Sequence, residues 1–257
     1  MRRLLRILQV YVKNAFLQWL AWRSFAFTLV ANQAVTPLIG LAVWSTALPG
    51  NNTLPLYYFV LLIVRLMTVS YENHTFSGKI YSGELAEELL RPHSIILQPI
   101  GDNLSIRIWH IIIGTPVLVI VPLVFPMTGI RASLIVAALP ALFLAACLQF
   151  VFTFSLALTA FWTERAHAVV SLGGTLVFLL GGVAVPVGLM PEMLQSVVEF
   201  LPFRLMMALP AEIITSSTTS MDIINSYLLQ LFWLLVFAMT SLLLWKKGVR
   251  RYTVVGG

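Results

Sequence analysis

The residue types that most often carry out chemistry are few in this sequence and are not grouped. The single cysteine, Cys147, has no second thiol to pair with and no neighbouring ligands for a structural zinc site. The four histidines, at positions 74, 93, 110 and 167, lack the His-Glu-x-x-His spacing of zinc enzymes. No Walker A segment, no Gly-x-Ser-x-Gly turn and no Gly-x-Gly-x-x-Gly turn occurs among the 257 residues. We therefore predict no catalytic residue, no metal site and no cofactor site in this chain.

Polar residues within apolar segments indicate contacts with other helices or with a substrate, because a polar side chain is costly in lipid. Arg65 is the one full charge well inside such a segment. We expect Arg65 to pair with Glu164, with backbone carbonyls or with a lipid phosphate, although an intramembrane cation can also meet an anionic substrate.

Two polar stripes at helical spacing lie in other apolar segments. The first contains Thr28, Asn32, Thr36 and Gly40, with Gln33 beside it. The second contains Gln149, Thr153, Ala157, Ala160 and Glu164. Such stripes face other helices or a polar path rather than lipid, and helix packing explains them as well as a substrate path does. The candidate path residues are Thr28, Asn32, Gln33, Thr36, Arg65, Gln149 and Thr153.

These polar residues belong to a chain whose solvent is largely lipid. Apolar residues make up 59% of the sequence and charged residues only 10%, and the mean hydropathy is +0.92. A spanning helix needs about 20 mostly apolar residues, and the runs lack the alternation of transmembrane strands. We predict an all-α integral membrane protein with six transmembrane helices, within residues 24–48, 55–72, 104–126, 132–161, 168–190 and 223–245.

The distribution of basic residues predicts the orientation of these helices. All but three of the 16 lysines and arginines lie on one side of the six segments; Arg131 and Arg204 lie on the other side and Arg65 lies within the second segment. The positive-inside rule then places both termini in the cytoplasm, for a multi-pass protein of the inner (plasma) membrane. No nucleic-acid-binding motif accompanies the basic composition, so we expect no nucleic-acid partner.

The N-terminal segment 1–23 reads as a basic amphipathic helix that lies on the cytoplasmic face against membrane lipid. The remaining residues, 24–257, are predicted to form a single transmembrane domain. On the outer side, four prolines cut residues 186–222 into short pieces among which carboxylates are interspersed. Pieces of this kind fit an outer segment, 191–221, that re-enters the membrane without crossing it.

The loop 71–103 between the second and third segments carries the acidic stretch SGELAEELLRP, residues 82–92. A short helix is expected from Gly83 to Pro92, because proline ends a helix. Leu85, Glu88 and Leu89 would share one face of this helix. A soluble partner on the cytoplasmic side and a merely solvated loop helix are equally compatible with the stretch alone.

Longer stretches resemble a known family. SGELAEELLRPHSIILQ resembles the Gly-x-Leu-x-x-x-Leu-Leu-Arg-Pro signature of type 2 ABC transporter permeases, the drug and polysaccharide exporter group, and LPFRLMMALPAEII is similar to that family's motif after the fifth span. The order of the segments agrees over essentially the whole chain. Glu87 and Glu88 make the first motif more acidic than the family pattern, and the TSSTTS stretch lacks a glycine often found there.

The resemblance implies a division of roles. Residues 1–22 would be a connecting helix, and residues 191–214 an outer re-entrant hairpin that closes the exit. The helix that couples to an ATPase would comprise Gly83, Glu84, Leu85, Glu87, Glu88, Leu89, Leu90, Arg91 and Pro92. The outer gate would comprise Leu201, Pro202, Phe203 and Pro210.

The resemblance also implies partners. The chain would be a half-transporter that pairs with a second permease subunit, identical or divergent, and with two copies of an ABC ATPase in which ATP and Mg are bound. The glycine-rich fifth segment and the polar first segment are the surfaces expected to form the dimer and the path.

Two other classes stay open. An ion-coupled secondary transporter would need an intramembrane carboxylate, and all ten acidic residues are expected at segment ends or in loops. A polytopic membrane enzyme would need a catalytic cluster. Drugs, lipids, peptides and glycans all remain possible substrates.

Overall fold

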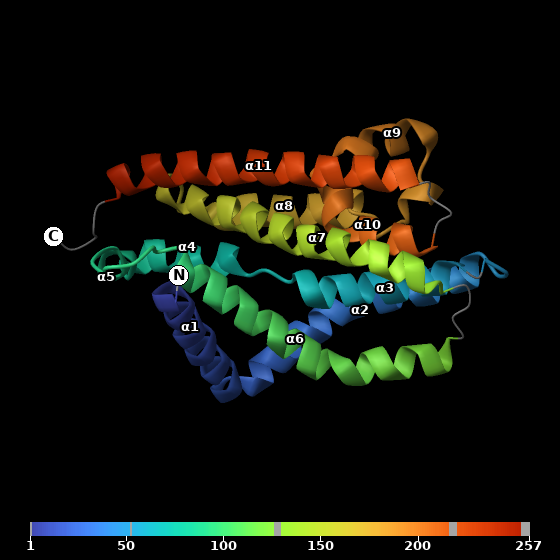
Figure 1. Cartoon of the computed structure of the whole chain (residues 1–257), viewed down its shortest axis with the longest axis horizontal. Helices are drawn as coiled ribbons and strands as arrows, with labels where there is room; N and C mark the ends of the chain where they lie inside the picture. The colour runs from blue at the N-terminus through green and yellow to red at the C-terminus, as the bar shows by residue number, and fades with distance from the viewer. Residues whose placement is uncertain (1, 52, 126–129, 216–219, 253–257) are drawn as a thin grey trace.

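The computed structural model describes the whole chain except residues 1, 52, 126–129, 216–219 and 253–257. The connection between the third and fourth predicted spans and the TSSTTS stretch, residues 215–220, therefore fall partly outside the described residues. Every regular element within the described ranges is a helix (Figure 1). The α-helices are α1 (Arg2–Ala21), α2 (Arg23–Ala47), α3 (Thr53–Thr68), α4 (Glu72–Ser82), α5 (Leu85–Leu89), α6 (Leu97–Val124), α7 (Ala132–Leu158), α8 (Ala166–Leu180), α9 (Glu192–Phe200), α10 (Pro202–Thr215) and α11 (Ser220–Arg251). Two short 3-10 helices are η1 (Thr159–Phe161) and η2 (Val187–Leu189).

Five helical stretches in the described part of the chain are long and apolar enough to cross a membrane. They are Arg23–Ala47, Thr53–Ser82, Leu97–Val124, Ala132–Phe161 and Met221–Arg251. This finding confirms the prediction of an all-helical membrane protein, whereas the count of six spans stays a prediction.

The sixth predicted segment, 168–190, contains only the 15-residue helix α8. At 1.5 Å per residue α8 is about 22 Å long, shorter than the roughly 30 Å hydrocarbon core. Gly182 follows the helix with a φ of 76°, and a side-chain carbon there would lie 2.6 Å from the Tyr57 hydroxyl. Tyr57 donates a hydrogen bond to the Gly182 carbonyl at 2.8 Å. The chain therefore turns at this glycine, and the predicted helix was too long.

The second predicted segment also differs, because the helix is interrupted within it. α3 ends at Thr68, residues 69–71 are not helical, and α4 begins at Glu72. The predicted loop 71–103 thus begins with a three-turn helix that packs against α7, where Phe76 contacts Phe154 with ring centroids 5.1 Å apart.

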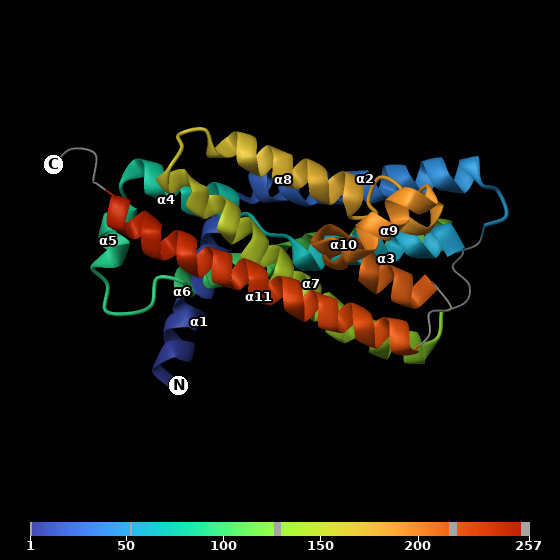
Figure 2. The same ribbon diagram turned by 90° about the horizontal axis from the view of Figure 1, so that it is seen from above.

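The elements form an elongated bundle with distinct ends. α7 packs against α11 and α10, α10 also packs against α3, and α1 packs against α6. Figures 1 and 2 show α5, the start of α1 and the last turns of α11 toward one end, with α9 at the other. The first and last described residues therefore lie toward the same end of the bundle.

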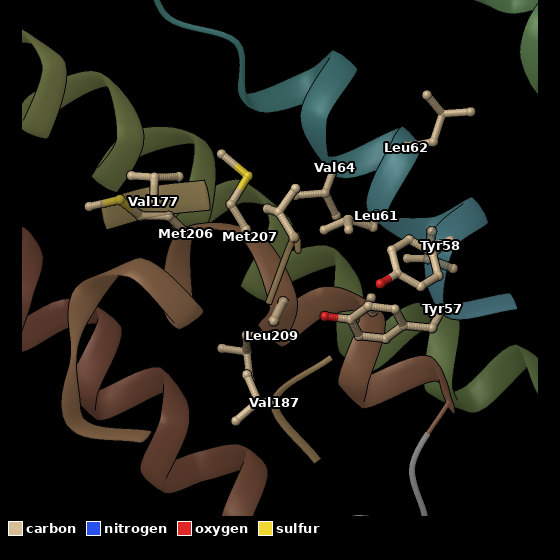
Figure 3. Packing of buried hydrophobic residues seen from close by; sticks show 14 of the residues in the cluster. Tyr57, Tyr58, Leu61, Leu62, Val64, Val177, Val187, Met206, Met207 and Leu209 are labelled. Carbon is tan, nitrogen blue, oxygen red and sulfur yellow. The ribbon is translucent and has the colours of Figure 1, made fainter. Parts of the chain in front are cut away.

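The core of the bundle is built around α10. Nearly every residue of α10 from Pro202 to Ile213 is buried, and Met206 and Leu209 meet Tyr57 and Leu61 of α3 in one apolar cluster (Figure 3). The sequence indicated short amphipathic pieces throughout the outer segment. Only α9 matches that expectation, with Met193 and Phe200 exposed, because α10 is enclosed by α3, α7 and α8.

Candidate functional site

A polar cavity of about 270 Å³ adjoins the break between α3 and α4. Its walls come from α2, α3, α4, α7, α8 and α10, and five of the predicted path residues line it: Gln33, Thr36, Arg65, Gln149 and Thr153. The other two, Thr28 and Asn32, are exposed on α2 and are not part of the lining. Parts of the two polar stripes and the partly buried Arg65 therefore converge on one site.

Arg65 is held by a neutral partner. Its Nε and Nη2 atoms donate hydrogen bonds to Gln33 Oε1 at 3.1 and 2.7 Å, and Gln33 Nε2 donates to the Tyr71 hydroxyl at 3.2 Å. The predicted pairing with Glu164 is not seen among the described contacts. Glu164 lies in the turn after η1 and lines a different groove with Tyr252, so it does not adjoin this cavity.

Asn103 and Arg107 of α6 form hydrogen bonds with groups at the break between α3 and α4. Asn103 Nδ2 lies 3.2 Å from the Val69 carbonyl, 2.9 Å from Ser70 Oγ and 2.7 Å from Glu72 Oε1. Arg107 donates from Nε to the Val69 carbonyl at 3.1 Å, and from Nη2 to a carbonyl of α7 at 2.7 Å. These donors satisfy backbone groups that an interrupted helix leaves free, which lipid could not do.

Glu72 is a buried carboxylate beside the cavity, only 2% exposed. Thr153 donates a hydrogen bond to Glu72 Oε2 at 2.9 Å, so the carboxylate joins α4, α6 and α7. Sequence reasoning missed Ser70, Glu72, Asn103 and Arg107. The available signals were the polar run SYENH after an apolar segment and the four-residue spacing of Asn103 and Arg107, which places both on one face of a helix. Within the described residues, no three His, Cys, Asp or Glu side chains gather to hold a metal ion.

The predicted coupling helix is shorter than expected. Gly83 does not begin it but ends α4, with a φ of 84° that suits glycine, and α5 covers only Leu85–Leu89. The remaining predicted residues, Leu90, Arg91 and Pro92, follow as turns.

The burial pattern of this loop also differs from the prediction. Leu85 is fully buried in a cluster with Phe76 and Ile80, so the chain itself covers this side chain. Glu84, Glu87, Leu89 and Leu90 are exposed, with Leu90 at 86%. Leu85 and Leu89 therefore do not form one free apolar face.

Charged groups tie the loop to its surroundings. Glu88 forms ion pairs with Arg91 at 3.2 Å and with Lys79 at 4.0 Å. Arg91 Nη1 also donates a hydrogen bond to the Tyr11 hydroxyl at 3.0 Å, and that hydroxyl lies 3.0 Å from His93 Nε2. The helix α1 is thus linked directly to the loop that carries α5.

Three of the predicted outer-gate residues, Leu201, Pro202 and Phe203, lie at the junction of α9 and α10, whereas Pro210 lies within α10. Leu201 joins the two helices, and Pro202, Phe203 and Pro210 are buried. Arg204 Nη2 lies 2.7 Å from Glu212 Oε2, and both side chains are largely buried. The α10 backbone is further fixed by Gln230, which donates to the Leu205 carbonyl at 2.9 Å.

Comparison with known proteins places this architecture in a family. Residues 17–256 match the family described as ABC-2 family transporter protein. No curated protein and no solved structure gives a significant match. The family match covers nearly the whole chain and agrees with a multi-pass membrane protein that serves as the transport subunit and is not itself catalytic. The chain belongs to the ABC-2 family of transporter proteins.

Proposed function

We propose that this chain is the permease subunit of an ATP-driven exporter, in which two permease subunits form the substrate path and each contacts one separate ATPase subunit. ATP and Mg bind in the ATPase, and the permease supplies the path. The observation that carries the proposal is the loop of α4 and α5, which exposes Leu89 and Leu90 at one end of the bundle while its other contacts are internal.

The loop is built to transmit a displacement. Leu85 and the Lys79–Glu88 pair fasten α5 to α4, and α4 packs along α7 and leads back to the break at residues 69–71. The break adjoins the polar cavity. A movement imposed on α5 by a closing ATPase dimer would therefore reach the cavity through packed elements.

A second permease subunit is supported by polar residues of α2 that do not line the cavity. Thr28 and Asn32 are exposed on this helix, whereas Gln33 and Thr36 of the same helix line the cavity. Polar residues in transmembrane helices face protein or water rather than lipid. We therefore assign α2, together with the glycine-containing helix α8, to the dimer interface.

The topology belongs to the same proposal. Both termini face the cytoplasm of a cell whose inner membrane holds the protein, and α8 with η2 supplies a sixth crossing. On the opposite face, α9 and α10 form the re-entrant outer gate. The lopsided distribution of lysine and arginine supports this orientation.

Co-purification with the ATPase tests coupling. Leu89→Asp should reduce assembly with the ATPase about tenfold or more, since a buried leucine contact contributes roughly 1.5–3 kcal/mol. Leu48→Asp is the matched control, because Leu48 is 39% exposed, Leu89 is 40% exposed, and Leu48 lies at the C-terminal end of α2. If both variants assemble with the ATPase as well as the wild type does, the loop is only solvated and does not contact the ATPase.

An ion-coupled transporter is the alternative, and Glu72 is the observation that favours it, because this carboxylate is buried within the stretch Thr53–Ser82. Proteoliposomes separate the two functions. Transport driven by an imposed proton gradient in the absence of any ATPase, and lost in Glu72→Gln, would support the alternative. Transport only with the ATPase and ATP would support the permease.

A further inference from the structure

We propose that the polar cavity binds the anionic group of an amphipathic organic anion, and that Arg65 is the residue that contacts this group. The inference rests on the proposed permease function and names the substrate class of its path. A phosphate, sulfonate or carboxylate could satisfy the site, whether it belongs to a free molecule or to a lipid headgroup.

The charge of the cavity wall is the first argument. Arg65 lines the cavity as a cation, and the lining contains no aspartate or glutamate. Among the ion pairs of the described residues, none involves Arg65. The nearby carboxylate Glu72 is engaged by Asn103 and Thr153. Since buried charges in proteins are normally paired, the guanidinium has an unused capacity for an anion.

The geometry of Arg65 is the second argument. A guanidinium offers five N–H donors, and the hydrogen bonds to Gln33 use only Nε and Nη2. Both go to the same neutral oxygen. An anion that replaced or joined this oxygen would form charge-assisted, fork-like hydrogen bonds, which are roughly twice as strong as neutral ones.

Unpartnered polar atoms elsewhere in the lining are the third argument. Thr68 Oγ1, Asn73 Oδ1 and Gln149 Oε1 are buried and have no hydrogen-bond partner among the described residues. Buried polar atoms are rarely left unsatisfied. A ligand with hydroxyl or amide groups beside its anionic group would satisfy them.

Apolar residues of the cavity lining account for the apolar part of the ligand. They are Phe152, Leu156, Val170, Val177, Phe178 and Met207. Two neighbouring glycines of α8 differ in how much space surrounds them. A side-chain carbon on Gly173 would lie 2.7 Å from Leu156, whereas one on Gly174 would meet nothing within 4 Å. Gly173 therefore permits close helix packing, and Gly174 leaves room in the cavity.

The test uses the full chain in phosphatidylcholine nanodiscs, titrated calorimetrically with 1-naphthyl phosphate and with 1-naphthylmethylamine as the cationic counterpart. The wild type should bind the phosphate and not the amine. Arg65→Gln should weaken phosphate binding about tenfold or more, because it removes the charge-assisted hydrogen bonds of the guanidinium. Arg65→Lys should retain most of it. Arg23→Gln is the control, because Arg23 is exposed at the start of α2.

A second variant keeps the proposal testable if both Arg65 variants fail to fold. Gly174→Leu fills the cavity without removing a charge and should abolish phosphate binding. Phosphate binding that is unchanged in Gly174→Leu, or in a folded Arg65→Gln, overturns the proposal, as does equal binding of the two probes by the wild type. Nanodiscs that contain phosphatidylglycerol distinguish the sources: competition there identifies the lipid headgroup as the anion, and undiminished binding identifies a free molecule.

The proposed function can fail independently. Phosphate binding without assembly with the ATPase would leave this inference in place and remove the permease function. Assembly with the ATPase without anion selectivity would remove this inference alone.

Discussion

Two buried arginines in this protein are held in opposite ways. Arg204, in α10, lies 2.7 Å from the carboxylate of Glu212. Arg65, in α3, donates to the neutral amide oxygen of Gln33. The first charge is compensated within the chain, in the densely packed core around α10. The second lines a cavity. The difference separates a charge that stabilises the fold from a charge that is available to a ligand.

The surroundings of the two arginines reinforce this contrast. α10 is enclosed by α3, α7 and α8, and the Gln230 side chain bonds to its backbone. The backbone near Arg65 is interrupted only four residues further along the chain and is held by side chains of α6. A region fixed by packing transmits force rigidly, whereas a region fixed by a few polar contacts can exchange them.

The largest expected effect comes from removing the carboxylate of the compensated pair. Glu212→Gln should lower the free energy of unfolding by about 3–5 kcal/mol, because Arg204 would remain buried without its counter-charge. Thermal unfolding in detergent, followed by tryptophan fluorescence, measures the loss. The double variant Arg204→Met, Glu212→Met should recover most of it. A loss no larger than that of Arg65→Gln would abolish the distinction between the two arginines.

A smaller effect is expected at the break between α3 and α4. Asn103→Ala should cost about 1–3 kcal/mol, since Val69, Ser70 and Glu72 would lose a buried donor. In the assembled transporter the same variant should hydrolyse ATP with less transport for each ATP consumed. Asn225→Ala, at an exposed position of α11, is the control and should behave as the wild type. Wild-type coupling in Asn103→Ala would show that the break does not transmit motion.

The convergence of the cavity residues could be predicted only in part. The helical spacing of Gln149 and Thr153 placed them on one face, and Arg65 drew attention as a charge in an apolar segment. Thr28 and Asn32 share the stripe of Thr36, yet they are exposed and do not line the cavity. The spacing of residues along a helix predicts which of them share a face, but it does not predict which other helix packs against that face.

The parts that could not be predicted depend on contacts distant in the sequence. No glycine or proline marks the break at residues 69–71, which α6 holds open through Asn103 and Arg107. The amphipathic pattern placed Leu85 on the same face of the short helix as Leu89. It could not show that Phe76 and Ile80 of the same chain, rather than a partner, would cover Leu85.

Removing the neutral partner of Arg65 should have a modest effect on stability. Gln33→Ala is expected to cost about 0.5–1.5 kcal/mol, as for a typical hydrogen bond, and therefore less than Glu212→Gln. If the cavity takes an anion, 1-naphthyl phosphate should raise the unfolding temperature of this variant at least as much as that of the wild type. A cost as large as that of Glu212→Gln would mean that Gln33 compensates the charge fully and that the cavity needs no ligand.

The smallest effect is expected where an arginine and a carboxylate pair at the surface. Arg91 and Glu88 lie 3.2 Å apart, much like Arg204 and Glu212, but the Arg91 side chain is 44% exposed. We expect this pair to contribute about 0.2–1 kcal/mol, because water solvates and salt screens the Arg91 charge, and Glu88 keeps Lys79 as a second cationic partner. Arg91→Gln should therefore change thermal unfolding little, and less at high salt, although it also removes the hydrogen bond to Tyr11.

The effect of Arg91→Gln on transport should differ from its effect on stability. Because Arg91 links α1 to the loop of α5, its loss should reduce ATP-coupled transport more than it reduces stability. Tyr11→Phe removes the same link and leaves the Arg91–Glu88 pair intact, so the two variants should be equally impaired in transport if the link to α1 matters. Normal transport in Tyr11→Phe with impaired transport in Arg91→Gln would assign the effect to the ion pair. A stability loss in Arg91→Gln as large as that of Glu212→Gln would show that pairing alone, and not burial, sets the energetic weight of these arginines.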